Sequence, residues 1–399
     1  MSAIKNIVIV VNCGSSSIKF ALYQTGKSLT CMLRGELKAI GTFNTKFVFT
    51  DTRSNEKHIG DIVAANHNSA IIFLLGWLET RIDFVSIKAI GHRIVQGMKH
   101  TQPELITEEL LIELKAISAY DPEHLPDEIK LIETFRTKYP ALPQIVCFDT
   151  AFHACMPPVA KLLPIPRRYQ AMGVQRYGFH GISYTYLVGE LERQAGKEPA
   201  KGKIILAHLG SGASIAAVNN GTCQDTSMGF TPASGLAMGS RTGDLDPGVV
   251  WYFMQTEKLT PQQFNHLINH QSGLLGISET SADMHELLQN ETTDYRAAEA
   301  VELFCYQAKK WIGSFAAVLN GVDTLVFSGG IGEHACEVRR RICDGLQFLG
   351  IELDEASNFK NDAIISSSTS KVCVRVISTN EEWMIAQLVD TFFEEGDKN

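Results

Sequence analysis

The stretch from residue 6 to residue 23 reads NIVIVVNCGSSSIKFALY, and it decides the fold. Residues 7–11 form an unbroken β-branched run, which is typical of a strand buried on both faces. Apolar residues then recur at every second position over 18–22, which predicts a second strand. The turn at 13–17 between them offers backbone N–H groups and hydroxyls that could wrap phosphate oxygens, with Lys19 just beyond it. An ordinary Gly/Ser hairpin turn is the alternative, because neither the GxxxxGK(S/T) pattern nor a following helix is present.

A second copy of this pattern occurs in the other half of the chain. Residues 203–218 read KIILAHLGSGASIAAV, an apolar strand, a Gly-Ser-Gly turn and another apolar strand. Alignment of the two copies sets Asn12 against His208 and Gly14 against Gly210. The repeat predicts a duplicated two-domain α/β fold with two phosphate-facing hairpins across a central interdomain cleft, as in the ribonuclease H-like superfamily of actin, hexokinase and the heat-shock ATPases.

The composition is that of a globular protein long enough for two domains. The chain has 399 residues, of which 45% are hydrophobic and 20% charged. Its formal net charge of −8 argues against a nucleic-acid partner, which would require a basic face. Any anionic ligand must therefore be met by locally placed lysines, arginines or metal ions.

The cysteines and the apolar runs indicate a cytoplasmic protein with no membrane partner. Nine cysteines are scattered without a CxxC pair, as in proteins of a reducing compartment. The apolar run near the N-terminus is too short for the core of a signal peptide. The most apolar internal stretch, residues 70–78, is too short to span a bilayer.

The order of predicted elements gives the domain boundaries. Strands at 32–40 and 46–50 extend a mostly antiparallel sheet, helical spacing covers 61–81, and a short strand follows at 87–91. We expect a first actin-like ATPase domain over residues 1–149, closed by a C-terminal helix at 383–399. A second actin-like domain over 150–382 is expected to bind the nucleotide and to form a dimer interface.

Three further patterns lie in the second half. The glycine-rich stretch 225–247 is long for a loop, and interspersed apolar residues predict that it is packed. Gly329–Gly332 leads straight from a strand into a helix, which would present backbone donors to an anion. Thr379 and Asn380 are expected to cap the last helix, which begins Glu381-Glu382.

The chain resembles the acetate and propionate kinase family over essentially its full length. The motifs that carry the resemblance, in order, are VVNCGSSSIK at 10–19, GHRIVQG at 91–97, FDTAFH at 148–153, RYGFHG at 176–181, HLGSGAS at 208–214, DTSMGFTP at 225–232, MGSRTGDLDPG at 238–248, SGLLGIS at 272–278, GGIGE at 329–333 and TNEE at 379–382. Ten motifs in family order make the resemblance highly specific.

The resemblance implies an enzyme that transfers a phosphoryl group between ATP and a carboxylate. The expected reaction is reversible, Mg²⁺-dependent and in-line, and it converts acetate and ATP to acetyl phosphate and ADP, with Mn²⁺ as an alternative metal. A kinase for propionate or butyrate is an alternative, and so is a nucleotide-operated clamp like actin that binds protein instead of a carboxylate. The resemblance also implies a homodimer.

The resemblance assigns roles to individual charged residues. Asn12 and Glu381 match the metal site, and both offer the hard oxygen ligands that Mg²⁺ requires. The alternative for Glu381 is an acidic residue that only stabilises a helix N-terminus. Arg93 matches the clamp on the substrate carboxylate, where its planar fork suits bidentate binding. A structural ion pair is the alternative for this arginine.

Three catalytic residues follow from the same motifs. They are Asp149, which orients the substrate or takes part in acid–base chemistry, and His180 and Arg241, which stabilise the transition state. The alternatives are a turn cap for Asp149, a structural loop histidine for His180 and a structural ion pair for Arg241.

The binding residues form two larger groups. The substrate pocket is assigned to Val95, Phe179 and Pro232, and a valine at position 95 favours a short acyl chain. The ATP site is assigned to Lys19, His208, Leu209, Gly210, Ser211, Gly212, Asp283, Met284, His285, Gly330, Ile331, Gly332, Glu333 and His334.

Several positions depart from the family pattern. The family commonly has Asn at Ser211, Arg at His285, Asn at His334 and His at Tyr184. It commonly reads Leu-His-Asn-Pro where this chain has EHLP at 123–126. These departures bear on the nucleotide contacts and the acyl pocket, whereas every proposed metal ligand and substrate arginine is retained.

Overall fold

The computed structural model describes residues 6–396 except 15 and 43. It consists of two compact units, and the chain passes between them twice. The first unit comprises the chain up to Ala151 and again from Asn380 onward, and the second comprises Phe152–Thr379. The sequence analysis had placed these divisions at 149/150 and 382/383. The second division falls earlier because the last helix begins at Glu381 and packs on strands of the first unit's sheet.

The sheet of the first unit has the order β5-β4-β3-β2-β1-β6-β8-β7. Its strands are β1 (Ile7–Cys13), β2 (Ile18–Gln24), β3 (Thr30–Lys38), β4 (Lys46–Asp51), β5 (Glu56–Asp61), β6 (Ile87–Ile94), β7 (Glu104–Leu105) and β8 (Gln144–Phe148). Strands β1 and β2 form the predicted antiparallel hairpin, with Asn12 opposite Lys19. Strands β1, β6 and β8 are parallel neighbours. Ser15, which belongs to the stretch 13–17 predicted as a turn, lies outside the described residues.

The sheet of the second unit repeats this arrangement in the order β11-β10-β9-β12-β13. Its strands are β9 (Lys203–Leu209), β10 (Ala213–Asn219), β11 (Thr222–Thr226), β12 (Thr324–Ser328) and β13 (Cys373–Val376). An antiparallel meander is again joined at its first strand to two parallel strands. This order matches β3-β2-β1-β6-β8 strand for strand. The expected duplicated α/β fold is therefore confirmed.

One predicted element was wrong at its start. The helical pattern read over 61–81 begins only at α1 (His67–Arg81), which Asn66 caps with its side chain. The residues just before it form β5, whose sequence EKHIGD leaves nearly every side chain exposed. An exposed edge strand needs no alternating apolar residues, so the pattern that reveals a half-buried strand is absent.

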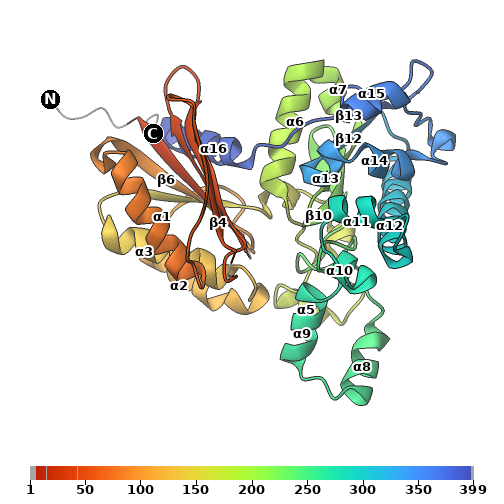
Figure 1. Cartoon of the computed structure of the whole chain (residues 1–399), viewed down its shortest axis with the longest axis horizontal. Helices are drawn as coiled ribbons and strands as arrows, with labels where there is room; N and C mark the ends of the chain where they lie inside the picture. The colour runs from red at the N-terminus through yellow and green to blue at the C-terminus, as the bar shows by residue number, and fades with distance from the viewer. Residues whose placement is uncertain (1–5, 15, 43, 397–399) are drawn as a thin grey trace. The chain divides into compact units, whose positions relative to one another are not determined.

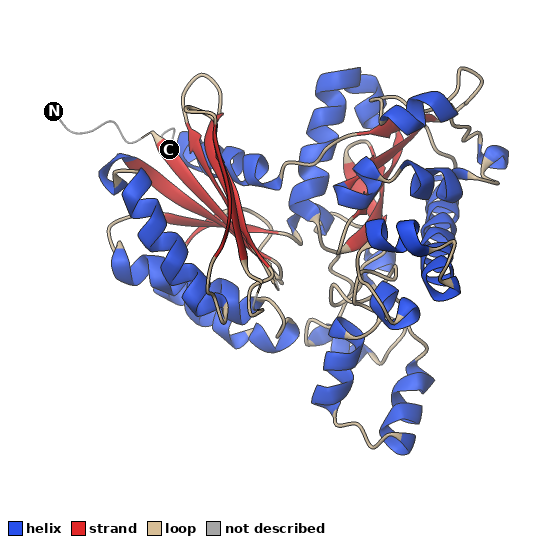
Figure 2. Cartoon of the chain, in the orientation of Figure 1, coloured by secondary structure: helices blue, strands red, loops and turns tan. Residues whose placement is uncertain are grey.

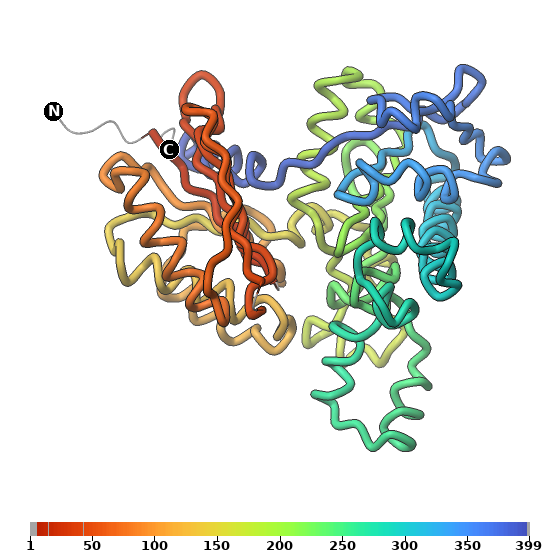
Figure 3. The backbone as a smooth tube through the Cα atoms, viewed as in Figure 1, coloured from red at the N-terminus to blue at the C-terminus, as the bar shows by residue number. Residues whose placement is uncertain are grey.

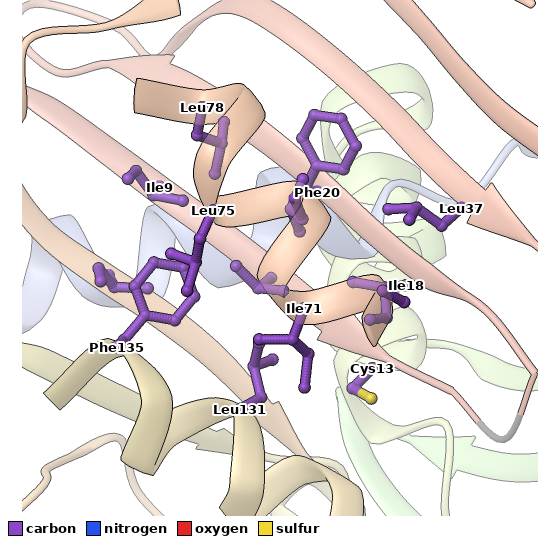
Figure 4. Close-up of a cluster of buried hydrophobic side chains, with 14 of the residues drawn as sticks. Ile9, Cys13, Ile18, Phe20, Leu37, Ile71, Leu75, Leu78, Leu131 and Phe135 are labelled. Atoms are coloured by element: carbon purple, nitrogen blue, oxygen red, sulfur yellow. The ribbon is translucent and has the colours of Figure 1, made fainter. Parts of the chain in front are cut away.

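Helices cover both faces of the first unit's sheet. Helices α1 and α3 (Leu125–Lys138) share a core with alternate residues of β1 and β2. Figure 4 shows Ile9, Phe20, Leu75 and Phe135 gathered in this core. Helix α2 (Glu108–Ala116) packs beside α3. Helix α16 (Glu381–Gly396) contacts β1, β2, β6 and β8, and Figure 3 traces it in dark blue beside the red strands of the N-terminal segment.

The second unit contains most of the helices, which surround the smaller sheet (Figure 2). They are α4 (Pro158–Lys161), α5 (Arg167–Ala171), α6 (Gly181–Ala195), α7 (Lys197–Lys201), α8 (Pro247–Thr256), α9 (Pro261–His270), α10 (Gly273–Ser278), α11 (Met284–Asn290), α12 (Tyr295–Leu319), α13 (Gly329–His334), α14 (Cys336–Cys343) and α15 (Glu355–Lys360). Residues 227–229 and 235–239 of the glycine-rich loop are buried, as predicted. No helix in the described part of the chain has the length and apolar character needed to cross a membrane.

In each unit, one helix that packs on the sheet follows the strands of the other unit in the sequence. Helix α6, labelled in Figure 1, comes after β8, the last long strand of the first unit. It packs on β9 of the second unit. Helix α16 comes after β13, the last strand of the second unit, and packs on the first. Each sheet is thus covered by a helix that follows the other sheet's strands.

Gly91 of β6 determines how closely α16 can approach the sheet. A Cβ atom at this position would lie 2.7 Å from Cγ2 of Ile385 and 2.8 Å from Cγ2 of Val389. Gly91→Ala should therefore destabilise the protein by about 1–3 kcal/mol through overpacking. The measurement is the thermal unfolding midpoint, which should fall.

Gly76→Ala is the matched control for this substitution. Gly76 lies on the exposed side of α1, and nothing would lie within 4 Å of its added Cβ. This variant should be unchanged or slightly more stable, because alanine favours the helix. Equal midpoints for both variants would contradict close packing of α16 on β6.

Candidate active site

Three polar residues of the first unit meet at one edge of its sheet. Asn12 lies near the end of β1, Arg93 near the end of β6, and Asp149 directly after β8. These strands are parallel neighbours, with Val11 opposite His92 and Ile94 opposite Phe148. The carboxyl ends of parallel strands are the usual place for ligand sites in α/β sheets.

The three side chains form a hydrogen-bonded cluster around the Arg93 guanidinium. Nη2 of Arg93 donates to Oδ2 of Asp149 over 2.7 Å, and Nη1 donates to Oδ1 of Asn12 over 3.4 Å. Asp149 is fully buried, whereas the Arg93 side chain keeps 12% of its surface exposed. Burial alone would lower the pKa of Arg93, but the carboxylates of Asp149 and Glu381 outweigh it, and the pKa is raised. The guanidinium therefore stays charged.

Two carboxylates from the start of α16 complete the cluster. Nδ2 of Asn12 donates to Oε2 of Glu381 over 3.0 Å and to Oε1 of Glu382 over 3.3 Å. Burial and the neighbouring Glu381 raise the pKa of Glu382, while Lys19 acts in the opposite direction. The sequence analysis did not assign Glu382 a role; its position beside Glu381 in the TNEE motif was the available signal.

The side chains around Asn12 include the hard oxygen ligands that a divalent cation such as Mg²⁺ takes. Asn12 and Glu381 supply an amide oxygen and a carboxylate within one hydrogen-bonded group. Among the described residues there is no group of three or more His, Cys, Asp or Glu side chains that could hold a metal by themselves. Mg²⁺ in phosphoryl-transfer sites usually takes one or two protein oxygens and completes its shell with phosphates and water.

Glu128 of α3 lies behind this cluster, and sequence reasoning missed it. Its carboxylate accepts the backbone N–H of Val95, at 3.3 Å from one oxygen and 3.1 Å from the other. The side chain is 2% exposed. Burial raises the pKa of Glu128 well above its usual range, although the charge of Arg93 opposes the shift. Glu128 thus holds the backbone that follows Arg93.

In the second unit, His180 has an unusual backbone conformation. It precedes the first residue of α6 with φ 60° and ψ 22°, a left-handed conformation that is uncommon outside glycine. Its Nδ1 lies 2.8 Å from Oγ of Ser214, and its ring stacks on His208 at 4.3 Å between centroids. Nδ1 of His208 lies in turn 2.8 Å from Oγ of Ser183. The imidazole of His180 is held on one edge and one face.

Gly212 brings the loop after β9 against both His180 and Arg241. A Cβ at Gly212 would lie 3.3 Å from Nε2 of His180 and 3.8 Å from Nη1 of Arg241. Nη1 of Arg241 also lies 3.3 Å from the carbonyl oxygen of Pro232, to which it donates. One histidine and one arginine side chain therefore converge on a glycine turn whose backbone can approach a ligand closely.

The glycine turns of the second unit abut one another. A Cβ at Gly210 would be 3.8 Å from the backbone nitrogen of Gly330, and the N–H of Gly239 donates to the carbonyl oxygen of Ser211 over 3.1 Å. Gly329 has φ 76°, and a side chain there would meet the backbone of Leu209. The three loops therefore pack against one another at the end of β9 and β12.

The remaining residues assigned to the nucleotide differ in exposure and in the hydrogen bonds that they already make. Asp283 caps α11, and one of its carboxylate oxygens accepts the N–H of His285 over 2.7 Å. His285 and His334 are exposed. The carboxylate of Glu333 accepts the N–H groups of Gly329 and Thr379 over 2.9 and 3.1 Å. Glu333 thus ties the glycine turn to the end of the second unit.

Five assigned residues have side chains that are buried within their own units. They are Val95, Phe179, Leu209, Pro232 and Met284. In this structure they could contribute backbone groups, as Pro232 does to Arg241.

The structure gathers the predicted residues into two sets. In the first unit, Asn12, Arg93, Asp149 and Glu381 lie in one bonded cluster, with Lys19 paired across the hairpin from Asn12. In the second, the residues brought together are His180, His208, Gly210, Gly212, Arg241 and Gly330. Ser214, Tyr184 and Ser183, which hold the two histidines, were not assigned as site residues.

The duplicated sheet with a glycine turn after the first strand of each half defines the class of phosphotransferases and ATPases that includes actin and hexokinase. Within that class, the sequence model described as the Acetokinase family matches residues 7–387. The chain belongs to the acetokinase family.

Relatives and solved structures match over nearly the whole chain. An acetate kinase of Rhodopseudomonas palustris is 42% identical over 392 residues, which cover 96% of this chain and 98% of the relative. A propionate kinase of Salmonella typhimurium is 38% identical over 386 residues, or 95% of each chain. The crystal structure of Porphyromonas gingivalis acetate kinase matches with a TM-score of 0.86 at 36% identity, covering 97% of this chain and 100% of that one. A propionate kinase from Francisella tularensis matches with a TM-score of 0.89 at 36% identity, covering 96% and 98%.

Glu128 gives a pH-dependent prediction. An acid whose pKa is higher in the folded state contributes stability below its unfolded pKa and loses it as the pH rises through the folded value. Glu128→Gln keeps an oxygen that can accept the Val95 N–H but does not ionise. We therefore expect the thermal unfolding midpoint of the variant, minus that of the native protein at the same pH, to increase from pH 5 to pH 8.

Glu394→Gln on the exposed part of α16 is the control for loss of one surface charge. Its midpoint should follow the native protein at both pH values. A midpoint of Glu128→Gln that stays level or falls relative to the native protein as the pH rises would contradict the raised pKa.

Proposed function

We propose that this protein is an acetate kinase, which transfers the γ-phosphoryl group of ATP to acetate by direct in-line displacement and runs reversibly. The observation that carries the proposal is the cluster of Asn12, Arg93, Asp149 and Glu381 at the carboxyl ends of three parallel strands. It occurs in a chain that is 42% identical to an acetate kinase. The reaction brings several anionic oxygens together, so positioning and charge compensation dominate catalysis.

Arg93 is assigned to the substrate carboxylate. Its guanidinium is charged, mostly buried and oriented by Asp149, which leaves part of the fork for a second carboxylate. Asp149 thereby orients the arginine in addition to any direct role in the reaction. Their short hydrogen bond keeps the arginine in place before substrate binds.

His180 and Arg241 are assigned to the transferring phosphoryl group. Both face Gly212, whose turn corresponds to the phosphate-binding hairpin of the duplicated fold. Donors aimed at the position where charge develops lower the barrier most. The nucleotide is assigned to the glycine turns at 210–212 and 329–332 and to Asp283, with Lys19 reaching the phosphates.

Asn12 and Glu381 would hold a magnesium ion, with Mn²⁺ as a substitute. When bound, the metal would neutralise charge on the β- and γ-phosphate oxygens. The chain's own contribution is to keep the carboxylates of Glu381 and Glu382 oriented through the amide of Asn12.

We further infer a cytoplasmic homodimer. All nine cysteines are free thiols, which suits a reducing compartment. Helix α8 has no buried residue and exposes 68% of Trp251 and 59% of Tyr252, as an association surface on the second unit would. Light scattering on the purified protein would test the dimer, and a monomer mass would reject it.

The acyl-chain preference tests the function. Purified protein, ATP and Mg²⁺ should give acyl phosphate, trapped by hydroxylamine as a coloured hydroxamate. Acetate should be preferred to propionate and butyrate. Each added methylene group changes the difference in transition-state binding free energy between two carboxylates by about 1–3 kcal/mol. Propionate should still react.

Reactions without ATP provide the blank. If no carboxylate of one to four carbons yields a hydroxamate, the kinase proposal fails. A higher kcat/KM for propionate than for acetate would favour the alternative function of the Francisella tularensis and Salmonella typhimurium relatives.

Two arginines should differ in which kinetic constant they affect. Arg93→Lys keeps a charge beside buried Asp149 but loses the planar fork, so the KM for acetate should rise more than kcat falls. Arg241→Ala removes a donor to the developing charge, and kcat should fall by roughly 10²–10³-fold.

Arg167→Ala is the control, because Arg167 is an exposed arginine that bonds Gln170. Steady-state kinetics that leave both site variants near the native values, with folding intact, would remove these assignments.

A further inference from the structure

We propose that Tyr184 is a positioning residue which, through Ser214, fixes the proton of His180 on Nε2. The inference rests on the proposed role of His180 as a hydrogen-bond donor to the phosphoryl group. It concerns a residue that the assigned reaction does not use.

The three side chains form a short hydrogen-bonded chain. Oη of Tyr184 lies 2.5 Å from Oγ of Ser214, and Oγ of Ser214 lies 2.8 Å from Nδ1 of His180. Tyr184 and Ser214 have no exposed surface. His180 and Tyr184 are one helical turn apart, and the N–H of Tyr184 donates to the carbonyl oxygen of His180 over 2.9 Å. The geometry is thus set by the start of α6 and by β10.

The position of one proton decides the tautomer. The Ser214 hydroxyl carries a single proton and lies between a phenol and an imidazole nitrogen. A phenol, with a pKa of about 10, is a better donor than an aliphatic hydroxyl. When Tyr184 donates to Ser214, the serine proton points to Nδ1 of His180. Nδ1 is then an acceptor, so a neutral imidazole carries its proton on Nε2.

Nε2 is the nitrogen that faces the phosphate-binding turn. A Cβ added at Gly212 would lie 3.3 Å from Nε2 and 3.8 Å from Nη1 of Arg241. A proton on Nε2 therefore gives two donors that face the same turn. The opposite tautomer would turn a lone pair toward anionic oxygens, which repel it.

A second hydroxyl chain holds the ring without deciding its proton. Oγ of Ser183 lies 2.8 Å from Nδ1 of His208 and 2.7 Å from Oγ1 of Thr379, and His208 stacks on His180. The stacking and the left-handed backbone of His180 fix the plane of the ring. The contact from Tyr184 determines that Ser214 donates the hydrogen bond and that Nδ1 of His180 accepts it.

Tyr184→Phe tests the inference because it removes one oxygen from a buried site and leaves the ring. Without the phenol, Ser214 can turn its proton away and accept from Nδ1–H. Net hydrogen bonds are worth about 0.5–1.5 kcal/mol, so kcat should fall roughly 2- to 12-fold. The KM values for ATP and acetate should be nearly unchanged, because the substrate contacts remain.

The direct measurement is the tautomer itself. Heteronuclear NMR of protein labelled with ¹³C and ¹⁵N in histidine reports which ring nitrogen is protonated, and the His180 signal is assigned by its loss in His180→Gln. The native protein should carry the proton on Nε2, and Tyr184→Phe should shift the population toward Nδ1–H. If Tyr184→Phe does not fold, Ser214→Ala tests the same contact at Nδ1.

Tyr186→Phe is the matched control, because it makes the same change on the same helix at a partly buried position. It should leave the His180 signal and kcat unchanged. A native His180 protonated on Nδ1 or on both nitrogens, or a signal unaffected by Tyr184→Phe, would overturn the inference whatever the activity. A shifted tautomer with unchanged kcat would support the inference and reject the catalytic role proposed for His180.

Discussion

The parallel pairing of β1, β6 and β8, repeated in β9, β12 and β13, is the constraint on which the rest of the structure depends. Parallel neighbours bring their carboxyl ends to one edge, so the residues that follow each strand become neighbours although they are far apart in sequence. In the first unit this edge collects Asn12, Arg93 and Asp149. In the second it sets His208 opposite Ser328, next to the glycine turn of α13. The two halves thus repeat one strand pattern and carry different side chains at its equivalent positions.

The distribution of charge at these edges explains how an acidic protein can accept anions. The chain carries a net charge of −8, yet Arg93 keeps its charge in a mostly buried position because carboxylates surround it. A buried guanidinium without a partner would be strongly destabilising. The second unit has no comparable carboxylate cluster at Gly212 among its described contacts; there, histidine, arginine and backbone N–H groups converge. The edge of the first unit is thus rich in carboxylates around one arginine, whereas the edge of the second unit carries histidine and arginine side chains.

Local patterns made the duplicated hairpins, the burial of the glycine-rich loop and the start of α16 predictable. The charged residues of the candidate site were predicted from the family resemblance and not from local patterns. The contacts that no local pattern encodes could not be predicted. Glu128 binds the Val95 backbone only because α3 packs behind β6, and Tyr184 reaches Ser214 only because α6 lies on β10. Strand β5 was missed for the opposite reason, since an exposed edge leaves no periodicity in the sequence.

The return of α16 to the first sheet has a consequence for biosynthesis. The strands β1 to β8 leave the ribosome before the second unit, but the helix that covers β1 and β6 follows the second unit in the chain. While the second unit is being synthesised, the apolar face of the first sheet that α16 covers is therefore still exposed. A chain cut before Glu381 would therefore hold all the strands of both units and still lack the helix that covers this face of the first sheet.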